Sequence, residues 1–168
     1  MVIVVMGVAG SGKSIIGSAV ANRLHWEFAD ADDLHPAANV EKMKRGEPLN
    51  DGDRWPWLEK VAEAIDAWIS TGKSGVVACS SLKESYRDKL RKNHPDQVRF
   101  AYLKGSYELF ENRLRQRKDH FMKSNMLESQ MATLEEPTSA DAFAFSADQP
   151  VDALVEEICS RFRSSNGD

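Results

Sequence analysis

The chain has little of what would indicate an extracellular, membrane-spanning or metal-cluster protein. Only two of its 168 residues are cysteines, Cys79 and Cys159, which are too few and too far apart for a disulfide framework or a metal cluster. No apolar run approaches the roughly 18 residues that would cross a bilayer. The apolar N-terminus lacks a basic leader region, so we interpret it as structure rather than as a signal peptide. These absences favour a cytoplasmic protein without a membrane partner.

An excess of positive charge is also missing. The 22 lysines and arginines are outnumbered by 26 aspartates and glutamates, which gives a formal net charge of −4. This balance offers no support for a nucleic-acid partner. The sequence shows no internal repeat and no low-complexity tract. Its length and its 42% of hydrophobic residues are typical of one globular domain, which we expect to comprise residues 1–168.

The most informative stretch lies at the N-terminus. Val2–Met6 is a short apolar run, typical of a strand that is covered on both faces. A glycine-rich run that fits G-x-x-x-x-G-K-[ST] follows at once, and apolar residues at helical spacing come next. This order predicts a loop whose backbone N–H groups wrap the phosphates of a nucleoside triphosphate at a helix N-terminus. The loop consists of Gly7, Val8, Ala9, Gly10, Ser11, Gly12, Lys13 and Ser14.

Two side chains of this loop have predicted roles. We expect Lys13 to reach the β- and γ-phosphates and the Ser14 hydroxyl to ligate Mg²⁺. A glycine-rich turn with a chance lysine is the alternative. It is disfavoured because every fixed position of the motif matches and the strand and helix stand on either side of it.

An acidic run, Asp30-Ala31-Asp32-Asp33, follows a second short strand predicted over 26–29. In an extended chain, Asp30 and Asp32 would point to the same side, about 6 to 7 Å apart. Carboxylates at the carboxyl end of a strand lie where α/β proteins bind ligands. A solvated acidic turn is the alternative, which the phosphate loop upstream makes less attractive.

The rest of the chain alternates helices with strands. This alternation predicts an α/β fold, a P-loop kinase core with a mainly parallel sheet of about five strands flanked by helices on both sides. Further helices are expected over 37–44, from Pro56 to about 70, over 83–91, 107–118 and 125–134, and from Pro150 onward; further strands are expected over 75–79, 98–103 and 142–146.

Two excursions interrupt this core. Residues of about 34–55 would form a substrate-side segment, with Arg54 in a loop before the helix at Pro56. Residues of about 117–137 would form a mobile lid. The stretch that leads into the lid has five cations against one acid between residues 113 and 123, which suggests a nearby anion rather than a solvated helix face. Arg113 and Arg117 share one face of the predicted helix.

Taken alone, His35 is more typical of a hydrogen-bonded structural histidine than of a metal ligand. It also belongs to a longer pattern. The pattern consists of the phosphate loop, Asp32 with Leu34-His35-Pro36, Asn39, Lys42-Met43, Gly46, Pro48-Leu49, Asp51, Asp53-Arg54, Pro56-Trp57-Leu58, Cys79-Ser80-Ser81-Leu82-Lys83, Tyr86-Arg87-Asp88, Tyr102-Leu103, Arg117-Lys118, His120-Phe121, Met126-Leu127 and Ser129-Gln130. With these residues the chain resembles the gluconokinases, which phosphorylate D-gluconate on its 6-hydroxyl. The family is similar to shikimate and adenylate kinases, and its match here is most specific over 34–58.

The resemblance implies ATP and Mg²⁺ as cofactors, D-gluconate as the small-molecule substrate and a homodimer. Mg²⁺ would bind Ser14 and, through water, Asp30, whereas Asp32 would bind the attacking hydroxyl and accept its proton. Extended geometry also admits the exchange of these two acidic roles. We assign Asp30 to the metal because it lies closer along the strand to the phosphate loop.

The remaining roles follow from the chemistry of a polyhydroxylated anion. The carboxylate calls for a guanidinium fork, for which Arg54 and Arg87 are the candidates. The groups expected to bind hydroxyls of the substrate are His35, Ser80, Ser81 and Lys83. Arg113 would pack near the adenine or the phosphates, and Arg117 would move in from the lid to stabilise transition-state charge.

Two other functions compete with this interpretation. A kinase of another small hydroxy acid, such as shikimate, is disfavoured by the Leu-His-Pro and Asp-Arg-x-Pro-Trp runs. A nucleotide-dependent switch protein is disfavoured by the basic helix and by the lack of an N-K-x-D motif. A catalytically dead relative is disfavoured because Lys13, Ser14, Asp30 and Asp32 are all present.

Overall fold

Five parallel strands form the centre of the molecule, in the order β2-β3-β1-β4-β5. The computed structural model describes residues 1–117 and 124–165. The predicted α/β fold with a parallel five-stranded sheet is confirmed. The strands are β1 (Val2–Met6), β2 (Glu27–Asp30), β3 (Gly75–Ala78), β4 (Val98–Lys104) and β5 (Phe143–Ser146).

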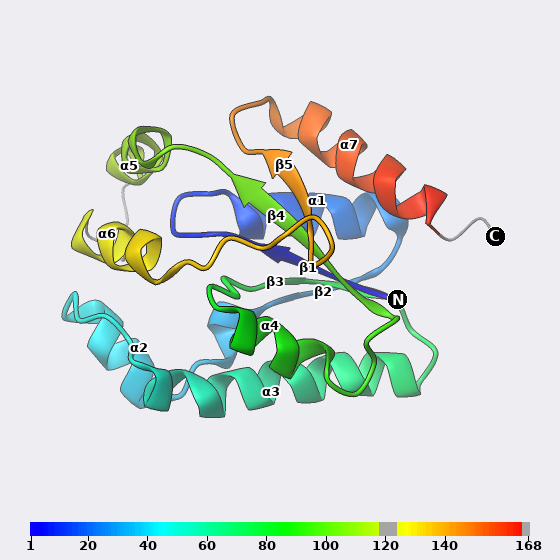
Figure 1. Ribbon diagram of the computed structural model, residues 1–168, viewed down its shortest axis with the longest axis horizontal. Coiled ribbons are helices and arrows are strands. Elements are labelled where there is room, and N and C mark those ends of the chain that lie inside the picture. The colour runs from blue at the N-terminus through cyan, green and yellow to red at the C-terminus, as the bar shows by residue number, and fades with distance from the viewer. Residues whose placement is uncertain (118–123, 166–168) are drawn as a thin grey trace.

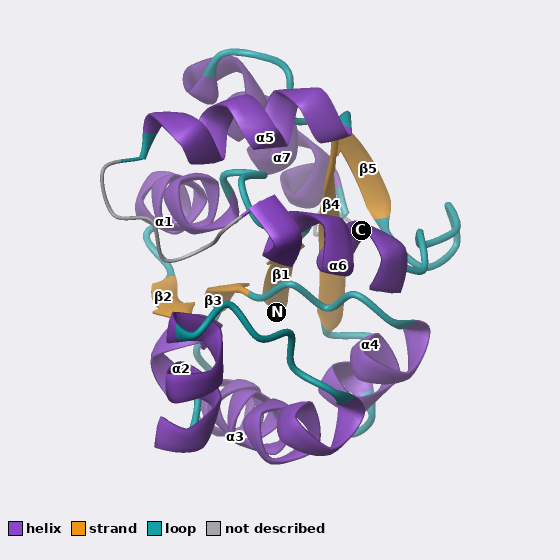
Figure 2. Ribbon diagram, turned by 90° about the vertical axis from the view of Figure 1, so that its left-hand side faces the viewer, coloured by secondary structure: helices purple, strands orange, loops and turns teal. Residues whose placement is uncertain are grey.

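Helices cover both faces of this sheet (Figure 1). Helices α1 (Lys13–Leu24) and α7 (Val151–Ser164) lie on one face, and α3 (Asp51–Ser70) and α4 (Glu84–Arg91) lie on the other. Figure 2 looks onto the carboxyl ends of the strands, where α2 (Ala37–Lys44), α5 (Tyr107–Gln116) and α6 (Ser124–Thr133) are gathered. These three helices therefore lie at the end of the sheet where the phosphate loop follows β1.

The central strand explains the register of the sheet. Every residue of β1 is 0% exposed, because β3 and β4 pair with its two sides and helices cover its faces. Val2 pairs with both Gly75 and Val98, so the three strands start at the same level. Gly75 has no side chain for a packing reason, since a Cβ there would lie 2.3 Å from the Trp68 ring. The sheet core thus holds the phosphate loop rigidly at the end of β1.

Helix α3 begins five residues earlier than predicted. The Asn50 side chain accepts from the Asp53 backbone N–H at 2.8 Å, and the Asp53 carboxylate accepts from the Asn50 N–H at 3.0 Å. This capping box starts the helix at Asp51. Pro56 lies inside the helix, and Arg54, which was expected in a loop, is helical. The prediction of a helix start at Pro56 was wrong because two side-chain contacts outweighed the proline signal.

The acidic run is not extended. Asp30 Oδ1 accepts from the Asp32 backbone N–H at 3.0 Å, which caps a short 3₁₀ helix, η1 (Ala31–Leu34). The predicted same-side geometry of Asp30 and Asp32 was therefore wrong, since a carboxylate that caps its own backbone two residues on bends the chain. None of the helices that the structure describes combines the length and apolar character needed to cross a membrane.

Candidate active site

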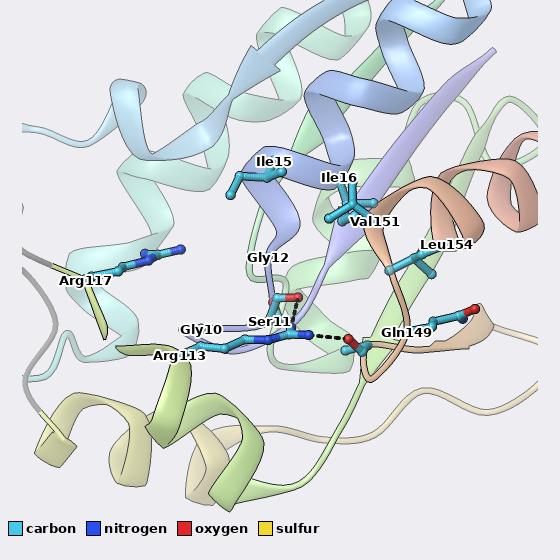
Figure 3. Close-up of a pocket in the computed structure, with 11 residues that line it drawn as sticks. Gly10, Ser11, Gly12, Ile15, Ile16, Arg113, Arg117, Gln149, Val151 and Leu154 are labelled. Carbon is cyan, nitrogen blue, oxygen red and sulfur yellow. Dashed lines mark hydrogen bonds between the residues drawn. The ribbon is translucent and has the colours of Figure 1, made fainter. Parts of the chain in front are cut away.

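Two hollows meet at the phosphate loop. The α7 hollow, of about 240 Å³, lies between the loop and α7 and is lined by Ile15, Ile16, Arg113, Gln149, Val151 and Leu154, among others (Figure 3). The α2 hollow, of about 260 Å³, lies between the loop and α2 and is lined by Lys13, Ser14, Asp32, Val40 and Met43, among others. Gly10, Gly12 and Arg117 line both. The arrangement offers two compartments that share one loop.

The loop has the conformation that its glycines permit. Gly10 has φ +81°, and a Cβ there would lie 2.7 Å from the Phe110 carbonyl oxygen, so this position needs glycine for two reasons. Gly12, also with positive φ, immediately precedes α1, which begins at Lys13. The backbone N–H groups of a first helical turn have no partner within the helix and attract anions. The predicted order of strand, loop and helix is confirmed.

The two residues predicted to hold Mg²⁺ are in direct contact. Ser14 Oγ donates to Asp30 Oδ2 at 2.5 Å, which joins the start of α1 to the end of β2. Oxygen donors are those that Mg²⁺ prefers, and it commonly takes only one or two from the protein while phosphates and waters complete its shell. Within the described residues no cluster of three or more His, Cys, Asp or Glu side chains could hold a metal by itself. The residues present fit an ion shared with bound phosphates.

Asp32 lies in the α2 hollow with Lys13. His35 stands beside it, with Nε2 3.9 Å from Asp32 Oδ1. The His35 ring stacks on Trp57, with centroids 4.2 Å apart and planes at 14°, and its side chain is 4% exposed. This burial lowers the pKa of His35, against the effect of Asp32, which raises it, so the ring is neutral at neutral pH. A carboxylate with a neutral imidazole beside it suits the binding of hydroxyl groups.

Arg54 and Lys83 come together around Tyr86. Arg54 Nη1 donates to the Tyr86 hydroxyl at 3.2 Å, and the Tyr86 hydroxyl donates to the carboxylate of Asp51. Lys83 Nζ donates to the same carboxylate at 3.0 Å. Arg54 is 6% exposed, and its charge is felt at His35, where it lowers the pKa. Of the two predicted substrate-site cations, Lys83 therefore contacts Asp51 of α3 directly, and Arg54 is connected to it through the Tyr86 hydroxyl.

Arg87 does not join this group. Its Nε donates to Asp141 Oδ2 at 2.9 Å, and its Nη1 donates to the carbonyl oxygens of Ser81 and Leu82 at 2.9 and 3.3 Å. The side chain is 2% exposed, and a buried guanidinium is stable only when it is paired in this way. Its interpretation as a fork for the substrate carboxylate is therefore corrected. Arg87 fixes the turn at Ser81, whose φ is +50°.

The serines of this turn lie behind the phosphate loop. The Ser80 carbonyl oxygen accepts from the Gly7 N–H at 3.3 Å, and Ser81 is fully buried. Neither hollow is lined by Ser80, Ser81 or Lys83, nor by His35 or Arg54. Of these predicted substrate contacts, His35 lies beside Asp32, which does line the α2 hollow.

Arg113 spans the floor of the α7 hollow (Figure 3). Its Nη2 donates to the Ala147 carbonyl oxygen at 2.6 Å, and its Nη1 donates to the Ser11 carbonyl oxygen at 3.4 Å. Arg117, just past the end of α5, reaches both hollows. The centre of the predicted lid, with Lys118 and Lys123, lies outside the described residues.

Comparison with known proteins decides the family. The model of the shikimate kinase family matches residues 9–163. The thermoresistant gluconokinase of Escherichia coli K12 is 48% identical over 154 residues, which cover 90% of this chain and 87% of that protein. The gluconokinase of Gluconobacter oxydans 621H is 39% identical over 165 residues, which cover 98% and 92%. This chain belongs to the gluconokinase family. The resemblance found in the sequence is confirmed.

Solved structures agree with this family. The crystal structure of a gluconokinase from Sinorhizobium meliloti 1021 superposes with a TM-score of 0.87 at 42% identity, over 96% of this chain and 91% of that one. A shikimate kinase from Aquifex aeolicus, at 17% identity and a TM-score of 0.58, shares the fold. The chain is thus a nucleotide-binding P-loop kinase, a transferase.

The sequence reasoning assigned no role to one residue of this gluconokinase site. Gln130 of α6 is 8% exposed, and its Oε1 accepts from the Ala9 N–H of the phosphate loop at 2.8 Å. The contact ties α6, which follows the centre of the predicted lid, to the loop 121 residues away. In the sequence, the position of Gln130 on the buried side of a predicted helix could have indicated such a contact.

Proposed function

We propose that this chain transfers the γ-phosphoryl group of ATP to the 6-hydroxyl of D-gluconate, which yields ADP and 6-phospho-D-gluconate. The observation that carries the proposal is the α2 hollow, where Lys13 of the phosphate loop and Asp32 line one compartment. Gluconokinase relatives over nearly the full chain support the choice of acceptor.

The nucleotide occupies the α7 hollow and the phosphate loop. Ile15, Val151 and Leu154 offer apolar surface to the base, and Arg113 lies beside it. The loop N–H groups and Lys13 bind the β- and γ-phosphates. Arg117, which reaches both hollows, adds positive charge where the phosphoryl group passes from one to the other.

Ser14 and, through water, Asp30 would hold Mg²⁺, and the structure joins these two side chains by a hydrogen bond. Bound there, the ion would neutralise charge on the phosphate oxygens.

Asp32 orients the acceptor and takes its proton. A primary alcohol is a poor nucleophile, so a carboxylate within hydrogen-bond reach holds the hydroxyl and accepts the proton as the new oxygen–phosphorus bond forms. The bond between the γ-phosphorus and its bridging oxygen breaks, and that oxygen leaves with ADP. Lys13 and Arg117 stabilise the negative charge on the phosphoryl group in transit.

Arg54 binds the substrate carboxylate, with Lys83 beside it. Hydroxyl groups of the acceptor bind His35, with Ser80 and Ser81 as further proposed contacts. We assign residues of about 34–55 to the substrate side and about 117–137 to a lid within a single domain, 1–168. Closure of the lid would keep water from competing as the acceptor.

The experiment that tests this function is ADP release in a coupled assay with ATP and a panel of acceptors. The panel contains D-gluconate and other sugar acids, neutral polyols, shikimate and nucleoside monophosphates. Rapid turnover with D-gluconate and formation of a phosphomonoester, seen by ³¹P NMR, would support the proposal. Preference for shikimate, or slow hydrolysis that no acceptor accelerates, would overturn it in favour of one of the two competing functions.

We further propose a homodimer in a cytoplasmic compartment. The dimer follows from the family resemblance, and sedimentation velocity will measure it: a single species with the mass of one 18.8 kDa chain would refute it. Both cysteines are free and buried, which suits a reducing compartment.

A further inference from the structure

Asn39 is a buried polar residue of α2 for which the proposed reaction has no direct use. It is 3% exposed. Its amide nitrogen donates to the Asp53 carbonyl oxygen at 2.8 Å and lies 3.2 Å from His35 Nδ1. A flipped amide would place its oxygen against the Asp53 carbonyl oxygen, two acceptors face to face. The nitrogen therefore makes both contacts.

This orientation decides where the proton of His35 sits. An amide nitrogen donates and cannot accept, so Nδ1 of His35 must be the unprotonated, accepting nitrogen of the ring. Because burial lowers the pKa of His35, the ring is neutral and carries a single proton. That proton is on Nε2, the nitrogen that faces Asp32.

The direction of this N–H is fixed by packing. The ring stacks on Trp57, and Trp57 Nε1 donates to the carbonyl oxygen of Ala31, next to Asp32, at 2.6 Å. The charged groups that act on the ring are Asp32 and Asp30 from the β2 and η1 side and Arg54 from α3. The stacking on Trp57, the hydrogen bond from the Asn39 amide and the nearby carboxylate of Asp32 together allow the imidazole ring of His35 only one orientation.

We propose that Asn39 is a positioning residue that sets the Nε2–H tautomer of His35 and so aims a fixed hydrogen-bond donor at the space beside Asp32. The inference deepens the proposed function, in which Asp32 binds the acceptor hydroxyl. The 3.9 Å between Nε2 and Oδ1 is too long for a direct hydrogen bond. A polyol fills both roles when one hydroxyl donates to Asp32 and its neighbour accepts from His35.

The opposite tautomer would be a poor partner for such an acceptor. An unprotonated Nε2 beside the Asp32 carboxylate would present two hydrogen-bond acceptors to the substrate. The second substrate hydroxyl would then lose the N–H group that donates to it. The site would thus discriminate against acceptors that lack a second hydroxyl beside the reacting one. Asn39 contributes this selectivity without touching the substrate.

The first test reads the tautomer without activity. In ¹⁵N-labelled wild-type protein, long-range ¹H–¹⁵N correlations of imidazoles distinguish the two neutral tautomers, and the spectrum of His35→Gln assigns the His35 signals among the four histidines. We expect a proton on Nε2 and none on Nδ1. In Asn39→Asp, the new carboxylate requires a proton on Nδ1, so the Nδ1 signal moves to its protonated position.

The second test reads the consequence. The KM for D-gluconate should rise about tenfold in Asn39→Asp and in His35→Leu, as expected for one lost hydrogen bond in a shielded site. The KM for ATP should stay the same. His35→Gln should retain most of the acceptor affinity, because the glutamine amide nitrogen takes the place of Nε2. Asn22→Asp, the same change on the exposed side of α1, is the matched control and should leave both constants unaltered.

The outcomes separate this inference from the proposed function. Wild-type His35 with its proton on Nδ1 would refute the inference, as would an Asn39→Asp spectrum in which Nδ1 stays bare. Equal losses in His35→Gln and His35→Leu would also refute it. Wild-type protein that fails to phosphorylate D-gluconate would refute the function, while the tautomer result would stand. If Asn39→Asp does not fold, the wild-type spectrum and the two His35 variants still decide.

Discussion

Lys13 and Asp32 line the same hollow although they follow different strands, β1 and β2. Their opposite charges suit the two ends of a phosphoryl transfer, the ammonium group at the phosphates and the carboxylate at the hydroxyl. Ser14 and Asp30 form the neighbouring pair. At the scale of single residues, the proposed mechanism gives each of these four side chains its own role, and substitution can test each assignment separately.

Replacement of Lys13 by alanine should abolish kinase activity and leave the fold intact. The ammonium group acts on the migrating phosphoryl group, and its loss should cost at least ~3 kcal/mol, by analogy with removal of one oxyanion-stabilising donor. This corresponds to a fall in kcat of more than about a hundredfold. Circular dichroism will monitor the fold, and Lys60→Ala, on the exposed side of α3, is the control. A folded Lys13→Ala variant with more than a tenth of wild-type turnover would contradict the assignment.

The two acidic roles should respond differently to metal. Asp30→Asn should raise the half-saturating Mg²⁺ concentration, and excess Mg²⁺ or Mn²⁺ should restore part of the activity. Asp32→Asn should lower kcat sharply without metal rescue, since the amide can bind the hydroxyl but cannot take its proton.

Initial rates over a metal titration measure both effects, and ATP hydrolysis without acceptor should survive better than transfer in Asp32→Asn. Rescue of Asp32→Asn and not of Asp30→Asn would exchange the roles. A change below tenfold in both variants would mean that the acidic turn is merely solvated.

Substitution of Arg54 should weaken substrate binding, whereas substitution of Arg87 should lower stability. Arg87→Met removes one of the two arginines that pair with Asp141, the other being Arg91, so the loss of stability should lie below the roughly 3 to 5 kcal/mol of a buried ion pair that is broken completely. Urea denaturation should show this loss, whereas the KM for D-gluconate of the folded variant should change little. Arg54→Met should raise that KM by more than tenfold. A large KM effect from Arg87→Met with unaltered stability would restore Arg87 to the substrate site.

At the scale of elements, α2 and the start of α3 act as one unit. Asn39 and Lys42 of α2 bind the backbone and the side chain of Asp53, which also closes the capping box of α3. The unit carries His35 at one end and Arg54 at the other. Its internal contacts help to set the distance between these two residues, which we propose bind the substrate.

The stability of this unit should fall in acid through Asp53. The hydrogen bond from Lys42 and that from the Asn50 backbone hold the pKa of Asp53 below its ordinary value. A lowered folded-state pKa adds stability above the unfolded-state pKa of about 3.9, and this stability disappears as the pH falls through the folded-state value. Asp53→Asn should therefore lower Tm at neutral pH and match the wild type in strong acid. Thermal melts over pH 2 to 7 will check this, with Glu63→Gln as the control on the same helix. A gap in Tm that is constant with pH would contradict the ionic explanation.

At the scale of the whole molecule, three separate stretches of the chain gather at the carboxyl ends of the strands (Figure 2). The phosphate loop, the segment from Asp30 to Arg54 and the pair α5 and α6 are far apart in sequence. Gln130 connects the last of these to the first. Helix α6 and the phosphate loop are thus joined by a hydrogen bond.

This arrangement predicts acceptor choice. D-gluconate should exceed D-glucose and shikimate in kcat/KM by orders of magnitude, because a neutral sugar leaves the buried Arg54 without its anion and shikimate lacks the open polyol chain. Initial rates over a concentration series of each acceptor will measure the ratios. Phosphorylation of D-glucose as efficient as that of D-gluconate would refute the proposed arginine site.

Local patterns in the sequence determined the chemistry of the phosphate loop, the alternation of strands and helices, and the family. These features depend on residues close together in the chain: the fixed spacing of glycines and lysine, short unbroken apolar runs for the strands, and an apolar period of 3.6 residues for the helices. Runs such as 34–58 could be matched to a family for the same reason. The helix over 37–44 was predicted from residues close together in the chain, and it is confirmed.

The tertiary structure decided the partners of polar side chains. The sequence does not distinguish Arg87 from Arg54. In the structure, the carboxylate of Asp141, 54 residues away, pairs with Arg87, whereas Arg54 donates to the uncharged hydroxyl of Tyr86, which does not neutralise its charge. The Asp30 carboxylate accepts hydrogen bonds from the Asp32 backbone and from Ser14. The Asn39 amide contacts His35, just before α2, and Asp53, in α3. Which donor meets which acceptor depends on how whole elements pack. A buried polar group takes the partner that packing places beside it, because remaining unpaired costs more than any local preference supplies.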